Sequence, residues 1–209
     1  EEIAQPTDVS VPDFFMFDIQ PEQLTELQDL LAEQGYTLSF LSPMLRARLD
    51  VINGLEIDAV EETPDEQLLQ RRMYNLTYQD ALKNSEILVE GDVWTGEWDF
   101  SSDQLPGISL EEGFAERMGL KIGDTLGFDV QSVPIEGRIM NTRKVEWNSF
   151  QPNFFVSFQP GVLDPAPKTF VAAISEVADE DRIPVQNSIV INLPNVSPSV
   201  QVAPGASIY

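Results

Sequence analysis

The sequence predicts an α+β protein, because a helical apolar periodicity and several strand-like stretches occupy separate parts of the chain. Leu24, Leu27 and Leu31 recur at the spacing that places them on one face of an α-helix. Most other apolar stretches are short, rich in β-branched or aromatic residues and bounded by turn residues. With 209 residues, 42% of them hydrophobic, the chain can bury one large core or two small ones.

The first part of the chain has the order β-α-β-β. Pro21 is suited to the first turn of the helix, and Gly35 to a left-handed cap at its end. The dipeptide Asn53-Gly54 is typical of a hairpin turn. The strands predicted around these signals are Asp13–Ile19, Tyr36–Leu41 and Leu45–Ile52.

From Asn75 onward the sequence predicts short strands of a small barrel or curled sheet, after a polar helix or connection over Glu61–Arg72. One helix interrupts them: Ser109 is predicted as its N-cap, with Glu112 completing a capping box. Gly119 is predicted to end it. The strands predicted here are Ile87–Val89, Thr125–Val130, Val133–Trp147 and Asn153–Phe158. Lys168–Ser175 is predicted as another strand near the end of the chain.

The end of the chain is less regular. Ala178–Leu193 fits either a short helix, with Pro184 in its first turn, or a strand through its Ile-Val-Ile run. The tail after Asn195 is predicted to be irregular. The predicted secondary structure thus changes from helix and strand to short strands and back. This change predicts a discontinuous lobe over residues 10–60 plus 165–205, with residues 75–160 inserted as a second, β-rich lobe.

The composition excludes much of the common chemistry of enzymes. The chain has no histidine and no cysteine, so it lacks the usual general base, the thiol nucleophile and the soft metal ligands. Neither a Ser-x-x-Lys frame nor a phosphate-binding glycine loop is present. We therefore expect no catalytic residue, no bound metal and no cofactor in this domain.

The charge is strongly acidic, with 35 Asp and Glu against 12 Lys and Arg, a net charge of −23. Such a surface repels phosphates, so we expect no nucleic-acid partner. Two acidic groups have sharper alternatives. Glu97 and Asp99, beside tryptophans, would suit a glycosidase cleft, and Asp179–Asp181 a loose calcium site. With 35 acidic residues, some pair beside aromatics is expected by chance, and a solvated acidic turn is the simpler interpretation of Asp179–Asp181.

One aromatic stretch is a candidate contact for a hydrophobic substrate or a partner. In a strand, Phe154 and Phe158 would share one face with Val156, and Phe155 would lie on the other. Both faces would then be apolar, which suits either a strand buried on both sides or rings that line a groove. The candidate contact residues are Trp147, Phe150, Phe154, Phe155 and Phe158.

Six segments, in order along the chain, resemble the YbbP-like branch of FtsX/MacB-type ABC transporter permeases. The most characteristic runs from Met140 to Gly161 and contains the aromatic stretch. The others are Val11–Gln23, Arg46–Gly54, Asn75–Leu82, Glu111–Val130 and Leu193–Ser197. The segments together span nearly the whole chain, while the tail from Pro198 matches less well.

The resemblance implies a MacB-type periplasmic domain with a discontinuous, porter-like βαβ lobe and an inserted, smaller β-rich lobe. It implies a bacterial inner membrane protein with this segment on the periplasmic side. It also implies partnership with the rest of the permease and with a separate cytoplasmic ATPase subunit, which would bind the ATP. A lipidic or hydrophobic substrate and a periplasmic lysophospholipase/thioesterase partner are further implications. A free-standing periplasmic binding or adhesion protein and an acid-catalysed hydrolase remain the alternatives.

Overall fold

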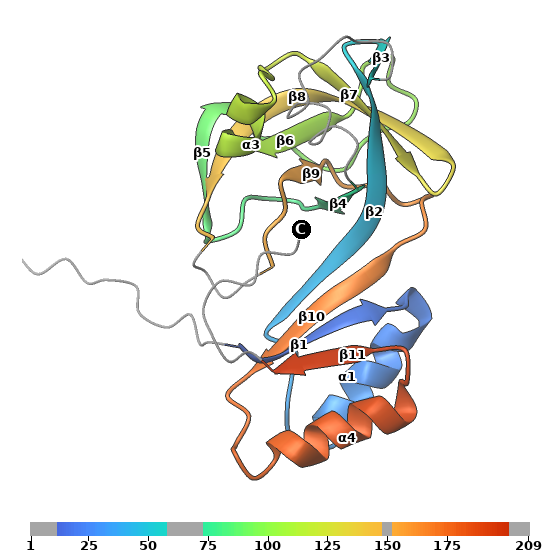
Figure 1. Cartoon of the computed structure of the whole chain (residues 1–209), viewed down its shortest axis with the longest axis vertical. Coiled ribbons are helices and arrows are strands. Elements are labelled where there is room, and N and C mark those ends of the chain that lie inside the picture. Colours follow the sequence, from blue (N-terminus) through green and yellow to red (C-terminus); the bar gives the residue numbers. More distant parts are fainter. Residues whose placement is uncertain (1–11, 58–72, 148–151, 201–209) are drawn as a thin grey trace, which may run out of the picture. The chain divides into compact units, whose positions relative to one another are not determined.

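The computed structural model describes residues 12–57, 73–147 and 152–200, which belong to two compact units (Figure 1). The described part of unit 1 consists of residues 12–41, 147, 152 and 170–200. That of unit 2 consists of residues 42–57, 73–146 and 153–169. These boundaries differ from the predicted lobes, because residues 42–57 lie in unit 2 rather than with the first lobe. The reason is the pairing of this segment, described below.

Unit 1 is a three-stranded antiparallel sheet with two helices. Strand β1 (Pro12–Ile19) lies in the middle, between β10 (Thr169–Ser175) and β11 (Ser197–Val200). A 3-10 turn (Pro21–Gln23) leads into α1 (Leu24–Ala32), and α4 (Arg182–Asn192) precedes β11. The two helices lie side by side in Figure 1.

The core of unit 1 lies between the helices and one face of the sheet. Alternate residues of β1, such as Phe14 and Met16, point toward the helices because side chains alternate along a strand. Leu27 and Leu31 of α1 and Val185 of α4 meet them. The apolar stripe of α1 is therefore used as the sequence predicts.

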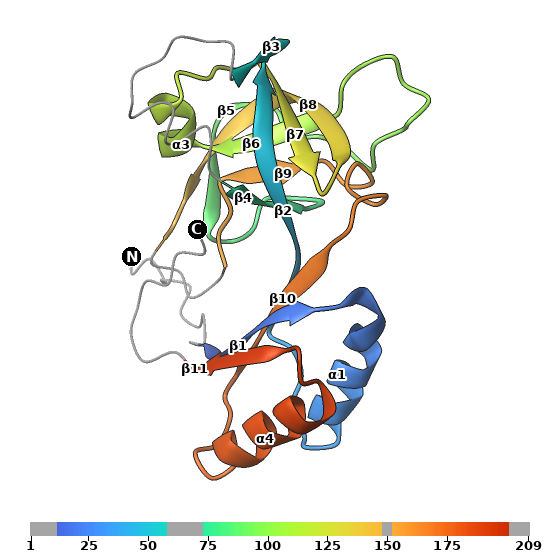
Figure 2. The same ribbon diagram turned by 45° about the vertical axis from the view of Figure 1, so that its right-hand side comes forward.

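Unit 2 is a closed barrel of six strands, seen from the side in Figure 2. Around the ring, β2 pairs with β4, β4 with β9, β9 with β6, β6 with β8, β8 with β7, and β7 again with β2. Pairs β4–β9 and β6–β8 are parallel, and the other four are antiparallel. The ring strands are β2 (Phe40–Ile52), β4 (Met73–Tyr78), β6 (Gly107–Glu111), β7 (Thr125–Val130), β8 (Val133–Val145) and β9 (Val156–Phe158).

Three further elements attach to this ring. Strand β3 (Leu55–Glu56) forms a hairpin with β2, and β5 (Glu86–Gly91) pairs with β8. Helix α3 (Glu112–Arg117) follows β6 directly. The barrel core is apolar and tight: a Cβ on Gly137 would lie 2.7 Å from Ile108, so the closure of the ring leaves no room for a side chain there.

Most of the predicted elements are confirmed in the described residues. The strand near residue 13, the α1 helix and the small barrel are present, and Gly35 has the left-handed φ of +84° expected at the helix end. Asn53 and Gly54 form the β2–β3 turn with φ of 51° and 77°. Of the two conformations open for residues 178–193, the helix is the one formed. The described chain is mixed α and β with few helices, as an α+β class requires.

Three local predictions are wrong. Ser109 is a buried residue of β6, and the residue that caps α3 is Glu111, whose carboxylate accepts from the backbone N–H groups of Gly113 and Phe114. Within the tail after Asn195, which was predicted to be irregular, residues Ser197–Val200 form β11 and pair with β1. The strand predicted from Tyr36 begins only at Phe40. The prediction for residues 61–72 lies outside the described residues.

Candidate functional site

The most unusual feature of unit 2 is a fully buried arginine on β8. Alternate residues of this strand turn inward, and the inward row includes Ile139, Asn141, Arg143 and Val145. Arg143 thereby occupies a position that an apolar residue would normally fill. A guanidinium cannot be deprotonated under ordinary conditions, so burying it requires a countercharge and hydrogen-bond acceptors.

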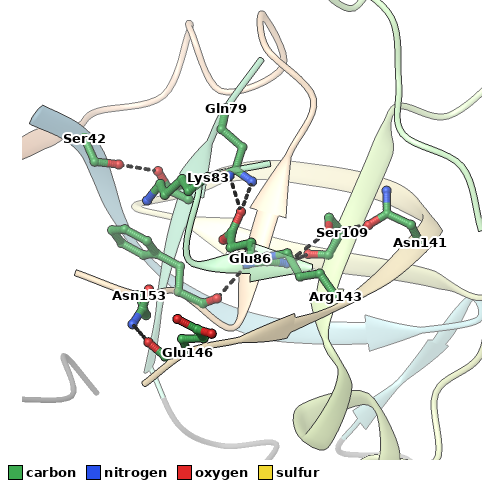
Figure 3. Close-up of polar contacts among 11 residues, drawn as sticks. Ser42, Gln79, Lys83, Glu86, Ser109, Asn141, Arg143, Glu146 and Asn153 are labelled. Atoms are coloured by element: carbon green, nitrogen blue, oxygen red, sulfur yellow. Dashed lines mark hydrogen bonds and ion pairs between the residues drawn. The ribbon is translucent and has the colours of Figure 1, made fainter. Parts of the chain in front are cut away.

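Arg143 finds acceptors on three neighbouring segments (Figure 3). Its Nε donates to Oε1 of Glu86 on β5 at 2.9 Å, and its Nη1 donates to the carbonyl and the hydroxyl of Ser109 on β6 at 2.7 and 3.0 Å. Its Nη2 donates to the carbonyl of Phe154, just before β9, at 2.6 Å. One side chain therefore joins β5, β6 and the segment entering β9 to β8.

Glu86 is held from its other side as well. Its Oε2 accepts from Nε2 of Gln79 at 2.7 Å and from the backbone N–H of Lys83 at 3.0 Å. Burial alone would raise the pKa of Glu86, but the charge of Arg143 and these hydrogen bonds outweigh burial and lower it. Glu86 is therefore ionised over a wide pH range, as the countercharge of Arg143 must be.

The network continues through amide and hydroxyl groups. The hydroxyl of Ser109 donates to Oδ1 of Asn141, and Nδ2 of Asn141 donates to the carbonyl of Asp92 at 3.0 Å. The indole N–H of Trp94 donates to the carbonyl of Gln79 at 3.0 Å. These bonds fix the loop that follows β5 against β8.

Lys83 borders the network. Its ammonium group lies 5.1 Å from the centre of the Phe154 ring. Burial lowers the pKa of Lys83 to about 8, an effect that Glu86 opposes and Arg143 strengthens. Ser42 and Thr77 form a nearby hydroxyl pair 3.0 Å apart, drawn in the same view (Figure 3).

This arrangement connects strands through hydrogen bonds and one ion pair, and we call it the Arg143 joint. The donors of Arg143 and the oxygens of Glu86 are used within the protein, so a ligand would have to displace a bond to reach them. Among residues 12–57, 73–147 and 152–200, no group of three Asp or Glu side chains is placed to hold a metal ion. Glu97 and Asp99 are exposed on a loop, where Asp99 accepts from the N–H of Ser101.

The structure separates the predicted aromatic contacts. Phe154 and Phe158 are buried in unit 2, and both contact its interior rather than solvent. Phe155 is half-buried: its ring stacks on Phe114, and the guanidinium of Arg117 lies 5.9 Å from it. Trp147 is half-buried in unit 1, and Phe150 lies outside the described residues. Phe155 is thus the unit 2 candidate with accessible surface.

The Arg143 network was not predicted from the sequence. The signal was present, since Arg143 falls in a strand whose alternate residues are apolar or small, and Glu86 opens the strand that pairs with it. Recognising the pair requires the β5–β8 register, which places Glu86 opposite Val145. A sequence does not supply that register.

Unit 2 carries an open groove of about 370 Å³. Strands β2, β7 and β8 line it with Val51, Phe128 and Ile135 and with three carboxylates. These carboxylates belong to Asp50, Asp129 and Glu136. Asp50 is already paired with Arg48 across the strand surface.

Comparison with known proteins gives the class first: the chain is a domain of the YbbP-like ABC transporter permease kind, which confirms the resemblance seen in the sequence. The relative is the Uncharacterized ABC transporter permease YbbP of Escherichia coli (strain K12). It is 32% identical over 162 residues, 78% of this chain and 18% of its own length. The chain thus spans less than a fifth of the relative. No family model matches the chain.

The relationship supports a transporter-associated role. The relative is named as a permease rather than as an enzyme. In the part of the chain that the structure describes, no helix is long and apolar enough to cross a membrane.

Proposed function

We propose that this chain is a periplasmic domain of an ABC transporter permease, where it relays ATP-driven motion and guides a lipidic or hydrophobic substrate out of the inner membrane. The observation that carries the proposal is the identity to a permease over 78% of the chain. In this proposal the ATP is bound by a separate cytoplasmic subunit, and the partners are that subunit and the rest of the permease. The domain itself needs no cofactor.

The geometry of unit 1 supports an insertion within a longer chain. Phe14, near the start of β1, lies opposite Val200 at the end of β11. The chain therefore enters and leaves this sheet at neighbouring positions, as an inserted domain does. The rigid Arg143 joint supports a relay, because a domain that transmits motion must move as a body rather than deform. We assign the two units to the porter-like lobe and the β-rich lobe of a MacB-type domain.

The same proposal includes a lipidic substrate and a lysophospholipase/thioesterase partner. Phe155 is the candidate contact, since it offers accessible ring surface above Phe114. We expect Phe155→Ala to leave the fold intact and to weaken substrate release by the full transporter. Phe158→Ala is the matched control: it empties a buried position and should cost about 3–5 kcal/mol of stability.

The relay is tested in the full permease with its ATPase subunit, after removal of any other cysteines. Because this chain has no cysteine, spin labels attach only at introduced thiols. Leu55→Cys in unit 2 and Ile183→Cys in unit 1 provide exposed labels on the two units. We expect the distance between the labels to change when ATP is trapped.

Leu55→Cys with Phe100→Cys gives a control pair within unit 2, whose distance should stay constant. An unchanged distance for the pair spanning the two units, in a transporter that still hydrolyses ATP, would contradict a relay between them. A free-standing binding or adhesion protein is the alternative. An open reading frame without flanking membrane segments would favour it.

A further inference from the structure

Strand β5 has an unused edge. Among the described residues it pairs only with β8, and its other edge meets no strand. An unpaired strand edge presents backbone N–H and C=O groups in the pattern that another strand would complete. Edges of this kind are where extended peptides add to a sheet.

The side chains along this edge are apolar and exposed. Ile87, Leu88 and Val89 are 57%, 38% and 47% exposed, three consecutive residues that water reaches. Ile122, 38% exposed, lies beside the end of the strand, since a Cβ on Gly91 would come within 2.9 Å of it. We call these four residues the β5 edge. Exposed apolar surface on a free strand edge is uncommon and usually marks a contact.

The β5 edge is held rigid without any partner. Glu86, the first residue of β5, is fixed by Arg143 and Gln79 as described above. At the other end, Asp92 donates its N–H to the carbonyl of Met140 at 3.3 Å and accepts from Asn141. A strand fixed at both ends loses little conformational freedom when a second strand is added, which favours binding.

The charge around the edge selects the occupant. Residues 84–116 contain no Lys or Arg, and the exposed Glu90 and Asp92 follow the apolar residues directly. By register, Lys144 of β8 lies opposite Ile87, and the buried Arg143, already paired with Glu86, lies opposite Leu88. Two copies of this acidic surface would repel each other, whereas a basic segment would be attracted.

We propose that the β5 edge binds an extended, basic segment of another protein, which adds to β8–β5 as a further strand. Its apolar side chains cover Ile87 and Val89, and its Lys or Arg side chains face Glu90 and Asp92. This inference goes beyond the transport role and does not depend on it. A second copy of the chain and a lipid surface are the competing occupants.

The test uses the whole chain and three synthetic probes: a short peptide alternating Val and Lys, its Val/Glu counterpart, and vesicles of neutral phospholipid. Binding is followed by fluorescence anisotropy and by amide hydrogen exchange. We expect the Val/Lys peptide alone to bind, to slow exchange of the amides of residues 86–91, and to bind more weakly in high salt. Ile87→Lys should weaken this binding at least tenfold, while Ile183→Lys, on the exposed face of α4, should not change it.

Several results would overturn the proposal. Equal binding of the Val/Glu peptide would show that the edge does not select a basic segment. Protection of amides outside residues 86–91 would show that the peptide binds elsewhere. Protection of these amides by vesicles in place of the peptide would assign the edge to lipid. Protection that depends on protein concentration without any peptide would assign it to a second copy.

Discussion

Each unit contains an arginine paired with a carboxylate, and the two pairs lie in different surroundings. In unit 2 the side chains of Arg143 and Glu86 are 0% and 2% exposed. In unit 1 Arg182 donates to Asp13 at 2.6 Å, but its side chain is 42% exposed. Water can replace the partner of Arg182, whereas only protein groups can satisfy Arg143. The comparison teaches that similar distances can carry very different energetic weight.

Removing each arginine should make this difference measurable. We expect Arg143→Met to destabilise the protein by about 3–5 kcal/mol, because the buried Glu86 would lose its countercharge and the carbonyl of Phe154 would lose its donor. Arg182→Met should cost no more than about 1 kcal/mol. Chemical denaturation of both variants checks the contrast, and equal losses would contradict it.

Acid should act on the buried pair. The pKa of Glu86 in the folded protein lies below its usual value of 4.5, so the folded state binds this proton less readily than the unfolded chain does. The stability from the pair is complete above that value and is lost as pH falls through the folded pKa. We expect Glu86→Gln to cost about 2–3 kcal/mol at neutral pH and to make the decline below pH 4.5 shallower.

Denaturation across an acid pH series measures both effects. The matched variant is Asp13→Asn, which alters the exposed pair of unit 1. An equally steep acid decline in wild type and in Glu86→Gln would show that other carboxylates control it.

Alkaline pH should have a smaller effect, because it removes the buried charge of Lys83 at the edge of the Arg143 network. The pKa of Lys83 falls from 10.5 to about 8 in the folded state because of burial, so the charged amine opposes folding below pH 8. Stability should therefore rise between about pH 8 and 10.5, by on the order of 1–2 kcal/mol. Lys83→Met should remove this rise relative to wild type, as should Lys83→Arg, which stays charged throughout. A rise that persists in both variants would assign it to other groups.

Salt should have the smallest effect, and it should act on both units. With a net charge of −23, repulsion between surface carboxylates opposes the compact state. Raising salt from about 10 mM to about 0.5 M screens this repulsion, and stability should increase by up to about 1 kcal/mol. The melting temperature of wild type, compared with that of Arg143→Met, measures it. A flat or falling melting temperature would contradict the expectation.

The sequence predicted correctly those elements that are specified by residues close together along the chain. The stripe of Leu24, Leu27 and Leu31, the Gly35 cap and the Asn53-Gly54 turn depend on neighbours along the chain, and all three hold. Ser109 misled because its spacing to Glu112 imitates a capping box. The competing force was tertiary: β8 and β9 pair with residues 107–111 and keep them extended.

The parts that failed depend on distant partners. Nothing within Ser197–Val200 predicts a strand, because its partner β1 lies at the other end of the sequence. Arg143 was missed for the same reason: its significance comes from Glu86, Ser109 and Phe154, which only the closed barrel brings together. Among the aromatic candidates, sequence alternation placed Phe154 and Phe158 on one face, but only the structure shows that this face is buried.

The antiparallel pairing of β1 with β11 has a mechanical consequence. Since Phe14 lies opposite Val200, a pull that separates the start of β1 from the end of β11 would load their hydrogen bonds one after another, like a zipper. A pull on both together in the same direction would load none of them. Chain segments attached at these two positions can therefore move unit 1 as one body when they pull in the same direction. They detach its edge strand β11 when they pull in opposite directions.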